Sequence, residues 1–231
     1  MAFNFSPKIV TNGLVLYLDA ANTRSYSGSG TAWNDLTVNG NNGVLTNGPT
    51  FNSSNGGSIV FDGSNDFVLC PNQTYLANIT QFTMSAWMKR NLSNSIVIIG
   101  QIQSITNDIA FELFNDGRAY FEVGNGSNSY GYVSNNSTNW QQLTMVFDGG
   151  ATTNENRLKG YINGVLVTLT FIGTIPATTG TINTNLNIGA YIPSSYYSNG
   201  NISQVSIYNR ALTAQEVLQN FNATKNRYNI L

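Results

Sequence analysis

Acidic side chains gather in one stretch of the sequence, FELFNDGRAYFE (residues 111–122). It contains Glu112, Asp116 and Glu122, and an Asn-Asp-Gly turn separates its two alternating halves. Such a turn predicts a β-hairpin, so Glu112 and Glu122 could face each other across two strands. Retaining glycoside hydrolysis needs two carboxyl groups about 5–5.5 Å apart. The alternative, which we favour, is a cross-strand pair near Arg118 on a solvated face.

Tyrosines cluster in two segments rich in Asn and Ser, and this pattern favours sugar binding. They are Tyr130 and Tyr132 in SNSYGYVSNN (127–136) and Tyr191, Tyr196 and Tyr197 in YIPSSYYSNGN (191–201). Sugar recognition needs amides for the hydroxyls and aromatic faces for the C–H side of the ring, and the amphipathic tyrosine ring suits such a wet interface. The alternative is that these rings pack on the fold or fill a subunit interface.

The composition excludes several chemistries. The 231 residues include no histidine, which removes Ser–His and Cys–His catalysis and histidine-bound metals. Cys70 is the only cysteine, so no disulfide can form within the chain, and we interpret it as a packing residue. Charged residues make up 9% of the chain and the net charge is −1. Neither nucleic acid nor an anionic membrane is therefore an expected partner.

The elements that would position these residues are β-strands. Alternation with a period of two runs through QFTMSAWM (81–88), DIAFELF (108–114) and LTMVFD (143–148), which gives each segment an apolar face. Turn signals such as Asn163-Gly164 separate the alternating segments. Their spacing, about 10–15 residues, is typical of an antiparallel sandwich.

We predict a short N-terminal arm, residues 1–12, followed by a single domain, residues 13–231. The arm carries Phe3, Phe5 and Ile9, and such apolar side chains favour docking on a neighbouring subunit. The N-terminus lacks the charged and apolar regions of a signal peptide, and no apolar run approaches the roughly 20 residues that span a bilayer. We therefore expect a protein that acts inside a cell or leaves it as part of a larger particle.

The segment NISQVSIYNRALTAQEVLQNF (201–221) changes from a strand pattern to a helical one. Thr213 and Glu216 have the spacing of a capping box, and Leu212 and Val217 have that of a hydrophobic staple. The predicted helix is only about two turns long and would not be stable alone. We therefore expect it to lie on the sandwich.

Eight pieces of the sequence, in order, resemble the laminin-G-like, concanavalin A-like lectin/glucanase superfamily. They are GLVLYLDA (13–20), NGNNGVL (39–45), SIVFDGSNDFV (58–68), FTMSAWMK (82–89), WQQLTMVFDGG (140–150), GYINGVLV (160–167), LNIGAY (186–191) and IYNRALTAQEV (207–217). The resemblance covers residues 13–223. It implies an all-β fold, a jelly-roll sandwich of two antiparallel sheets with a short C-terminal helix.

The resemblance also implies calcium, because many members hold one Ca²⁺ at the sandwich edge through Asp, Asn and backbone oxygens. The candidate ligands are Asp62, Asn65 and Asp66 of FDGSND, with Asp19 and Asp148 at strand ends. Related closing strands often carry an acidic pair where this chain has Ser203-Gln204, which removes a carboxylate. The alternative is that Asp62 and Asp66 form Asx turns.

The same resemblance bears on function. Glucanases of this superfamily carry a Glu-x-Asp-x-x-Glu strand motif, which this sequence lacks, so we predict that the protein is not an enzyme. The segment GLVLYLDAANTRSYSGSGTAWNDL (13–36) resembles proteins common in bacteriophages, including those of aquatic bacteria. That likeness implies a virion decoration or fibre protein, which contacts other virion proteins or copies of itself and adheres weakly to cell-surface glycan. The alternatives are a free, extracellular carbohydrate-binding lectin module and, less favoured, a glycoside hydrolase.

Overall fold

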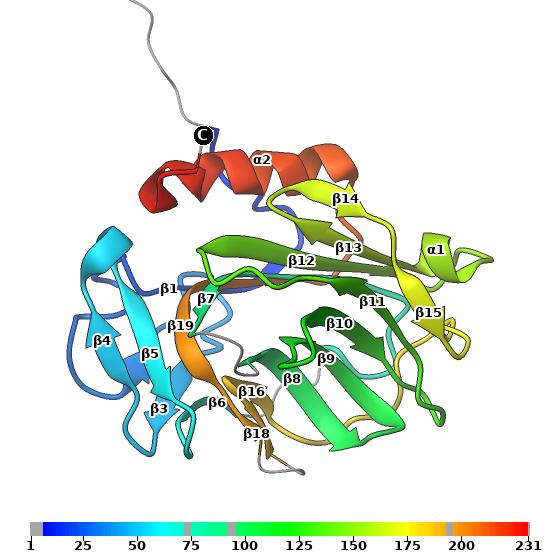
Figure 1. Cartoon of the computed structure of the whole chain (residues 1–231), viewed down its shortest axis with the longest axis horizontal. Coiled ribbons are helices and arrows are strands. Elements are labelled where there is room, and N and C mark those ends of the chain that lie inside the picture. Colours follow the sequence, from blue (N-terminus) through cyan, green and yellow to red (C-terminus); the bar gives the residue numbers. More distant parts are fainter. Residues whose placement is uncertain (1–6, 72–74, 92–95, 193–195, 231) are drawn as a thin grey trace, which may run out of the picture.

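Two antiparallel β-sheets stack face to face in the computed structural model, which describes residues 7–71, 75–91, 96–192 and 196–230 (Figure 1). The strands of the first sheet are β1 (Leu14–Asp19), β4 (Thr50–Asn52), β5 (Ser58–Asp62), β7 (Gln81–Arg90), β12 (Gln141–Asp148), β13 (Leu158–Ile162), β14 (Val165–Val167) and β19 (Asn199–Tyr208). They have the order β14-β13-β12-β7-β19-β5-β4, and β1 also pairs with β19.

The second sheet supplies the other layer. Its strands are β2 (Ala32–Trp33), β3 (Gly43–Thr46), β6 (Phe67–Cys70), β8 (Ile96–Ser104), β9 (Asn107–Leu113), β10 (Arg118–Val123), β11 (Tyr130–Ser134), β15 (Thr170–Ile172) and β16 (Leu186–Ile188). They have the order β15-β11-β10-β9-β8-β16-β6-β3-β2. The remaining elements are the ribbon of β17 (Ala190–Tyr191) and β18 (Tyr196–Tyr197), the helices α1 (Asn154–Arg157) and α2 (Ala214–Thr224), and the 3-10 helices η1 (Ser54–Gly56) and η3 (Lys225–Tyr228).

The core lies between the two sheets and consists of the inward residues of alternating strands. Phe82 of β7 and Phe147 of β12 come from the first sheet, and Phe111 of β9 and Phe121 of β10 come from the second. All four are fully buried. Burying one such side chain contributes roughly 1.5–3 kcal/mol, and a one-residue slip would turn the whole apolar set of a strand to the other face. The predicted all-β, two-sheet jelly-roll sandwich is confirmed.

The tight hairpins have the predicted turns. Between β13 and β14, Asn163 and Gly164 have φ angles of 52° and 76°. A type I′ turn needs positive φ at both positions, which Asn and Gly tolerate best. Between β9 and β10, the Asn115-Asp116 pair leads to Gly117, whose φ is 79°. The hairpin that carries the acidic residues is therefore present.

The C-terminal helix α2 lies across the outer face of the first sheet (Figure 1). The predicted capping box is confirmed: Thr213 Oγ1 accepts the Glu216 N–H at 3.3 Å, and Glu216 Oε2 accepts the Thr213 N–H at 2.9 Å. Arg210 pairs with the same carboxylate at 2.6 Å, and this hydrogen-bonded pair lowers the pKa of Glu216 to about 2. The helix has 11 residues, longer than the two turns that the sequence predicts.

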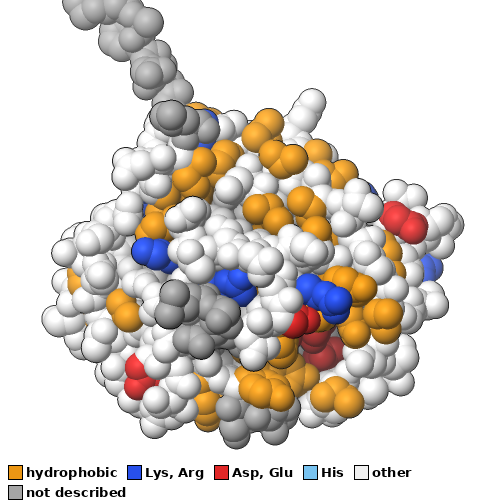
Figure 2. Space-filling model, in the orientation of Figure 1, with side chains coloured by type: hydrophobic (Ala, Val, Ile, Leu, Met, Phe, Trp, Pro, Cys, Tyr) orange, Lys and Arg blue, Asp and Glu red, His pale blue; other side chains and the backbone are white. Residues whose placement is uncertain are grey.

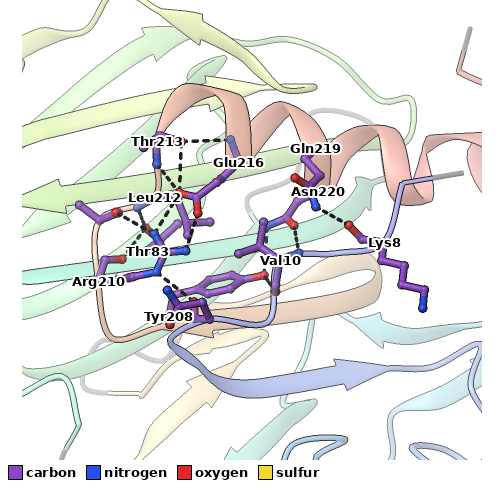
Figure 3. A network of polar contacts seen from close by, with 12 residues as sticks. Lys8, Val10, Thr83, Tyr208, Arg210, Leu212, Thr213, Glu216, Gln219 and Asn220 are labelled. Carbon is purple, nitrogen blue, oxygen red and sulfur yellow. Dashed lines mark hydrogen bonds and ion pairs between the residues drawn. The ribbon is translucent and has the colours of Figure 1, made fainter.

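Residues of the N-terminal arm bind along α2 of the same chain (Figure 3). Gln219 Nε2 donates to the Lys8 carbonyl at 2.8 Å, and the Val10 N–H donates to Asn220 Oδ1 at 2.8 Å. The Tyr208 hydroxyl donates to the Val10 carbonyl at 2.9 Å. The end of the predicted arm is therefore hydrogen bonded to α2 and to β19.

The apolar arm residues of the assembly prediction are only partly described. Phe3 and Phe5 lie outside the described residues, and Ile9 is half-buried. Within residues 7–71, 75–91, 96–192 and 196–230, no helix is long and apolar enough to span a membrane.

The outer face of the second sheet is covered differently. The ribbon β17–β18 lies next to β8, where Tyr191 packs with Val97, Ile102 and Ala110. The outward side chains of β9, β10 and β11 lie beside this ribbon, and they include the acidic and tyrosine residues that the sequence analysis selected.

Candidate functional site

A pocket of about 360 Å³ opens on the outer face of the second sheet, between β9, β10 and β11 and the ribbon β17–β18. Small-molecule sites usually measure roughly 300–1,000 Å³. Figure 2 shows acidic side chains in a recess over β9 and β10, between apolar side chains and next to a basic one. The lining residues are Ile105, Asp108, Glu112, Phe114, Tyr120, Glu122, Asn128, Tyr130, Tyr191 and Tyr196.

Strand alternation places three carboxyl groups on the pocket side. In β9, Phe111 points into the core, so Glu112 beside it points outward, and Asp108 shares that outward face. In β10, Glu122 is outward by the same rule, because Phe121 points inward. We call Asp108, Glu112 and Glu122 the carboxyl cluster.

The strand register sets how these groups meet. Glu112 lies opposite Tyr120, and Glu122 lies opposite Ala110. Glu112 and Glu122 are therefore diagonal neighbours on one face rather than a directly opposed pair, and diagonal side chains of this length can touch. Glu122 hydrogen bonds to both Glu112 and Asp108.

Burial raises the pKa of every member of the carboxyl cluster. It raises the pKa of Asp108 to about 6 and, together with the charge of Asp108, that of Glu112 to about 8. Burial and the two neighbouring carboxylates raise the pKa of Glu122 well above its usual range. At neutral pH, Glu112 and Glu122 therefore keep their protons while Asp108 is largely ionised. The Tyr191 hydroxyl donates to Asp108 Oδ2 at 3.5 Å.

Glu112 lies in a different environment from the solvated face that we favour from the sequence. It is 2% exposed, and its Oε2 atom has no hydrogen-bond partner among the described residues. Arg118 does not offset its charge, because its guanidinium lies 4.7 Å from the Tyr132 ring centroid and 3.8 Å from Asp116 Oδ2. The expectation of a solvated pair near Arg118 is therefore wrong for Glu112.

Aromatic rings form the walls of the pocket. The ring centroids of Tyr120 and Tyr130 are 5.6 Å apart, and those of Phe114 and Tyr196 are 6.1 Å apart. Tyr191 meets Tyr196 edge-on at 6.4 Å. The two tyrosine segments that the sequence singles out, about 60 residues apart, thus contribute to one site.

Two of the five selected tyrosines lie outside the pocket lining. Tyr132 lies two residues beyond Tyr130 on the same face, and the Arg118 guanidinium lies over its ring. Tyr197 lies opposite Ala190 in the ribbon and is half-buried.

Sequence reasoning missed several lining residues. Asp108 and Tyr120 share the parity of Glu112 and Glu122 in their strands, so period-two alternation was a usable signal for them. Phe114 also has the parity of Glu112 in the alternating segment 108–114, whereas Ile105 and Asn128 lie beyond strand ends, where no periodic signal exists. Their placement depends on how the hairpin and the ribbon pack.

The loop FDGSND uses much of its oxygen supply internally. Asp62 Oδ1 accepts the Ser64 N–H at 2.8 Å, Asp66 Oδ2 accepts the Asp62 N–H at 3.1 Å, and the Asn65 carbonyl accepts from Asn47 Nδ2 at 3.0 Å. Ca²⁺ takes six to eight oxygen ligands. Across the described part of the chain, no three His, Cys, Asp or Glu side chains are placed to hold a metal. These hydrogen bonds use one oxygen each of Asp62, Asp66 and Asn65, and the calcium site at this loop stays a prediction.

Asp19 lies away from that loop. Asp19 pairs with Gln204 in β19, whereas Asp62 pairs with Asn199, five residues earlier in the same strand and thus roughly 15 Å away. Two guanidinium nitrogens of Arg227 each donate to the Asp19 carboxylate at 3.0 Å. The structure therefore gives Asp19 an ion-pair partner from the C-terminal segment and separates it from the loop.

Comparisons with known proteins agree on the fold. A sequence model of the concanavalin A-like lectin/glucanases superfamily matches residues 62–218. None of the curated proteins matches the chain. Among solved structures, the receptor-binding domain of the botulinum neurotoxin C/D mosaic serotype superposes with a TM-score of 0.65 at 14% identity. That match covers 90% of this chain and 51% of the toxin domain.

Two other solved structures are similar over nearly the whole chain. Trypanosoma rangeli sialidase has a TM-score of 0.68 at 14% identity, with 95% of this chain and 34% of the sialidase covered. Domain 4 of AbnA, a GH43 extracellular arabinanase from Geobacillus stearothermophilus, has a TM-score of 0.63 at 20% identity, with 89% and 96% covered.

These structural likenesses, all at low identity, concern the fold alone. The chain spans about half of the toxin domain and about a third of the sialidase. The sequence match is independent of them and includes strands from both sheets and the start of α2. On this sequence match and this architecture, the chain belongs to the concanavalin A-like lectin/glucanases superfamily.

Proposed function

We propose that this domain binds carbohydrate, without cleaving it, in the pocket on the outer face of the second sheet. The observation that carries the proposal is that two distant tyrosine segments and the carboxyl cluster line one pocket. Tyr130, Tyr191 and Tyr196 supply aromatic faces, and Asp108 and Glu122 supply hydrogen-bonding groups. A largely apolar lining with a few convergent polar groups is typical of ligand sites.

A sugar suits both kinds of lining. Its C–H faces pack on aromatic rings, and its hydroxyls both donate and accept hydrogen bonds. A carboxylate only accepts, whereas a protonated carboxyl also donates. Because the pKa of Asp108 is about 6 and that of Glu112 about 8, the pocket holds both forms at neutral pH. Two similar structures support the proposal, since one was solved with arabinotriose and one with SialylT.

Binding without hydrolysis is the second part of the proposal. Retaining hydrolysis needs an ionised carboxylate that reaches the reacting carbon of the sugar. Burial and the charge of Asp108 raise the pKa of Glu112 to about 8, so Glu112 keeps its proton at neutral pH. Glu122 also keeps its proton, because burial and the neighbouring carboxylates raise its pKa. Asp108 is largely ionised, but it is only 3% exposed and accepts from the Tyr191 hydroxyl at 3.5 Å, so the cluster favours recognition over catalysis.

A glycan array followed by titration of the best-bound glycan tests the proposal. Tyr130→Ala and Tyr196→Ala should each weaken binding at least tenfold, about 1.4 kcal/mol, because each removes a wall of the pocket. Tyr197→Ala is the matched control: it changes the same residue type in the same ribbon but outside the lining. Equal losses in all three variants, or release of reducing ends from the glycan, would contradict the proposal.

The same array, repeated with EGTA, tests the calcium expectation. Binding that persists in EGTA is the result we expect, because the pocket lies on β9, β10 and the ribbon and the candidate calcium loop lies between β5 and β6. Binding that disappears in EGTA and in Asp62→Ala would assign a calcium ion to the loop and connect it to recognition.

We also propose a role in particle assembly, which the likeness to bacteriophage proteins suggests, with a second copy of this chain as the partner. An exposed apolar surface favours it. Val165 and Leu166 of β14 are 63% and 54% exposed, and Leu218 of α2 is 44% exposed. Gly164, in the turn just before β14, lies close to Leu218, so this surface is continuous. β14 is an edge strand, which can pair with the same strand of a second copy. Figure 2 shows apolar side chains over this region.

Leu166→Asp should therefore shift self-association at least tenfold toward monomer, because it places a charge in an apolar contact. Sedimentation velocity over a concentration series measures the shift. Val38→Asp is the control, since Val38 is fully exposed and lies outside β14 and α2. A chain that stays monomeric at every concentration would rule out assembly through this edge.

A further inference from the structure

The charges around the pocket have one sign. Its lining includes Asp108, Glu112 and Glu122 and, among the described residues, no Lys or Arg. The nearest basic side chain of the hairpin, Arg118, is engaged outside the lining by Asp116 and the ring of Tyr132. A ligand that carries a carboxylate would find no basic partner in this lining. A ligand that carries a cation would meet the ionised Asp108 and two further carboxyl groups that can ionise beside it.

The aromatic walls favour the same kind of ligand. Rings of Phe114, Tyr120, Tyr130, Tyr191 and Tyr196 surround the cluster. They present faces in several directions, because Tyr120 and Tyr130 are tilted by 56° and Phe114 and Tyr196 meet at 74°. The faces of aromatic rings attract cations, and such cages are a known way to bind ammonium groups.

An unpartnered buried oxygen is the third and independent observation. Glu112 lines the pocket, is 2% exposed, and leaves Oε2 without a hydrogen-bond donor among the described residues. A buried acceptor without a donor is unfavourable, so the site has a place for a donor from a ligand. An ammonium group carries three N–H donors and no acceptor, which matches three acidic side chains.

We propose that the pocket recognises a glycan that carries a free amino group, with the ammonium between the tyrosine rings and the carboxyl cluster. This inference rests on the proposed carbohydrate function and names its ligand class. The sugar ring packs on Tyr130 and Tyr196, and the ammonium donates to Glu122, the most exposed member of the cluster. N-acetylation of the amine removes the charge and two of its three N–H donors. The N-acetylated glycan should therefore bind less tightly than the free-amine glycan.

Proton release follows from this arrangement. In the free protein, Glu112 and Glu122 hold protons at neutral pH, because burial raises their pKa values. An ammonium beside them favours the ionised form, so a carboxyl proton passes to the buffer on binding. Besides its own three members, the titratable groups that face the carboxyl cluster are the hydroxyls of Tyr120, Tyr130, Tyr191 and Tyr196. Burial raises the pKa values of Glu112 and Glu122, so these carboxyl groups are the source of the released proton.

Calorimetric titration with a matched pair of ligands tests the inference. The probes are the β-1,4-linked glucosamine trisaccharide and its fully N-acetylated form, at pH 7 in two buffers of different ionisation enthalpy. We expect the free-amine form to bind at least tenfold more tightly and to release protons. Glu122→Gln should reduce the preference to about twofold or less, whereas Glu155→Gln, which changes an exposed helix residue outside the pocket, should preserve it.

The other outcomes are decisive as well. Equal affinity for the two trisaccharides, or a preference for sialylated or uronate glycans, would overturn the amine inference and leave the carbohydrate function intact. Tetramethylammonium bound as tightly as the free-amine trisaccharide would show a cation site with no role for the sugar, which overturns the inference. No glycan bound on the array would overturn both. The comparison between trisaccharides needs only the wild-type chain, so it stands even where Glu122→Gln does not fold.

Discussion

Replacing Trp87 by alanine is expected to lower the free energy of unfolding by about 3–5 kcal/mol. Trp87 is fully buried on the outer face of β7, between the first sheet and the C-terminal segment. Truncation of a buried tryptophan loses the burial of a large apolar surface and leaves a cavity that its neighbours fill only partly.

The contacts of Trp87 show why the loss should be large. Its ring stacks on Tyr228 at 4.0 Å and on Phe221 at 5.7 Å between centroids. Its Nε1–H donates to Thr224 Oγ1 at 2.8 Å, inside the protein. Alanine at this position leaves the Thr224 hydroxyl without that donor and removes the surface on which α2 and η3 pack. A helix of 11 residues is marginal without such packing.

Trp140→Ala is the matched control for this prediction. Trp140 is half-buried and packs at the border of the same cluster, where its ring is tilted by 43° to Tyr228 with centroids 4.9 Å apart. An aromatic pair of this kind contributes about 0.5–1.5 kcal/mol beyond its area, so the control should lose clearly less stability. Urea denaturation of both variants measures the difference. Losses of the same size in both would mean that α2 is not held by Trp87.

Sequence signals predicted those features that depend on a few neighbouring residues. The capping box of Thr213 and Glu216 and the turn at Asn163-Gly164 are local, because each rests on the chemistry of adjacent backbone groups. Period-two alternation predicted that Phe111 faces the core and that Glu112 does not. That much follows from strand geometry alone.

Long-range packing decided the rest. Alternation predicts on which face of β7 the Trp87 side chain lies. The residues that bury it there, Phe221 and Tyr228, come from a segment more than 130 residues away. In the same way, alternation cannot distinguish a bare sheet face from one that the ribbon β17–β18 partly closes. Glu112 is buried for that reason, and a pair expected in solvent lies instead in a pocket.

The second large effect is expected from Glu112→Gln, as a change in how stability depends on pH. The pKa of Glu112 is raised from 4.5 to about 8, first by burial and then by the charge of Asp108. Between these two pH values, the folded state holds a proton that the unfolded state has lost. The stabilisation is therefore fully present below pH 4.5 and is lost as the pH rises toward 8. The slope is about 1.4 kcal/mol per pH unit for each such proton.

Over two pH units, from about pH 5.5 to 7.5, the wild-type chain should thus lose roughly 3 kcal/mol through Glu112 alone. Asp108 and Glu122 add to this loss, because their pKa values are also raised. Glutamine keeps the shape and carries no charge at any pH. The variant should therefore be the more stable protein near pH 8 and show a slope smaller by about one proton.

Urea denaturation at a series of pH values measures the two slopes, and Glu155→Gln provides the control. Glu155 undergoes the same chemical change in the first turn of α1, on the exposed surface, where no buried proton is gained on folding. Its slope should equal that of the wild type. A Glu112→Gln slope that also equals the wild type would mean that Glu112 is ionised in the folded protein. The pocket would then hold a charge that water or a bound cation must solvate, because Oε2 of Glu112 has no donor among the described residues.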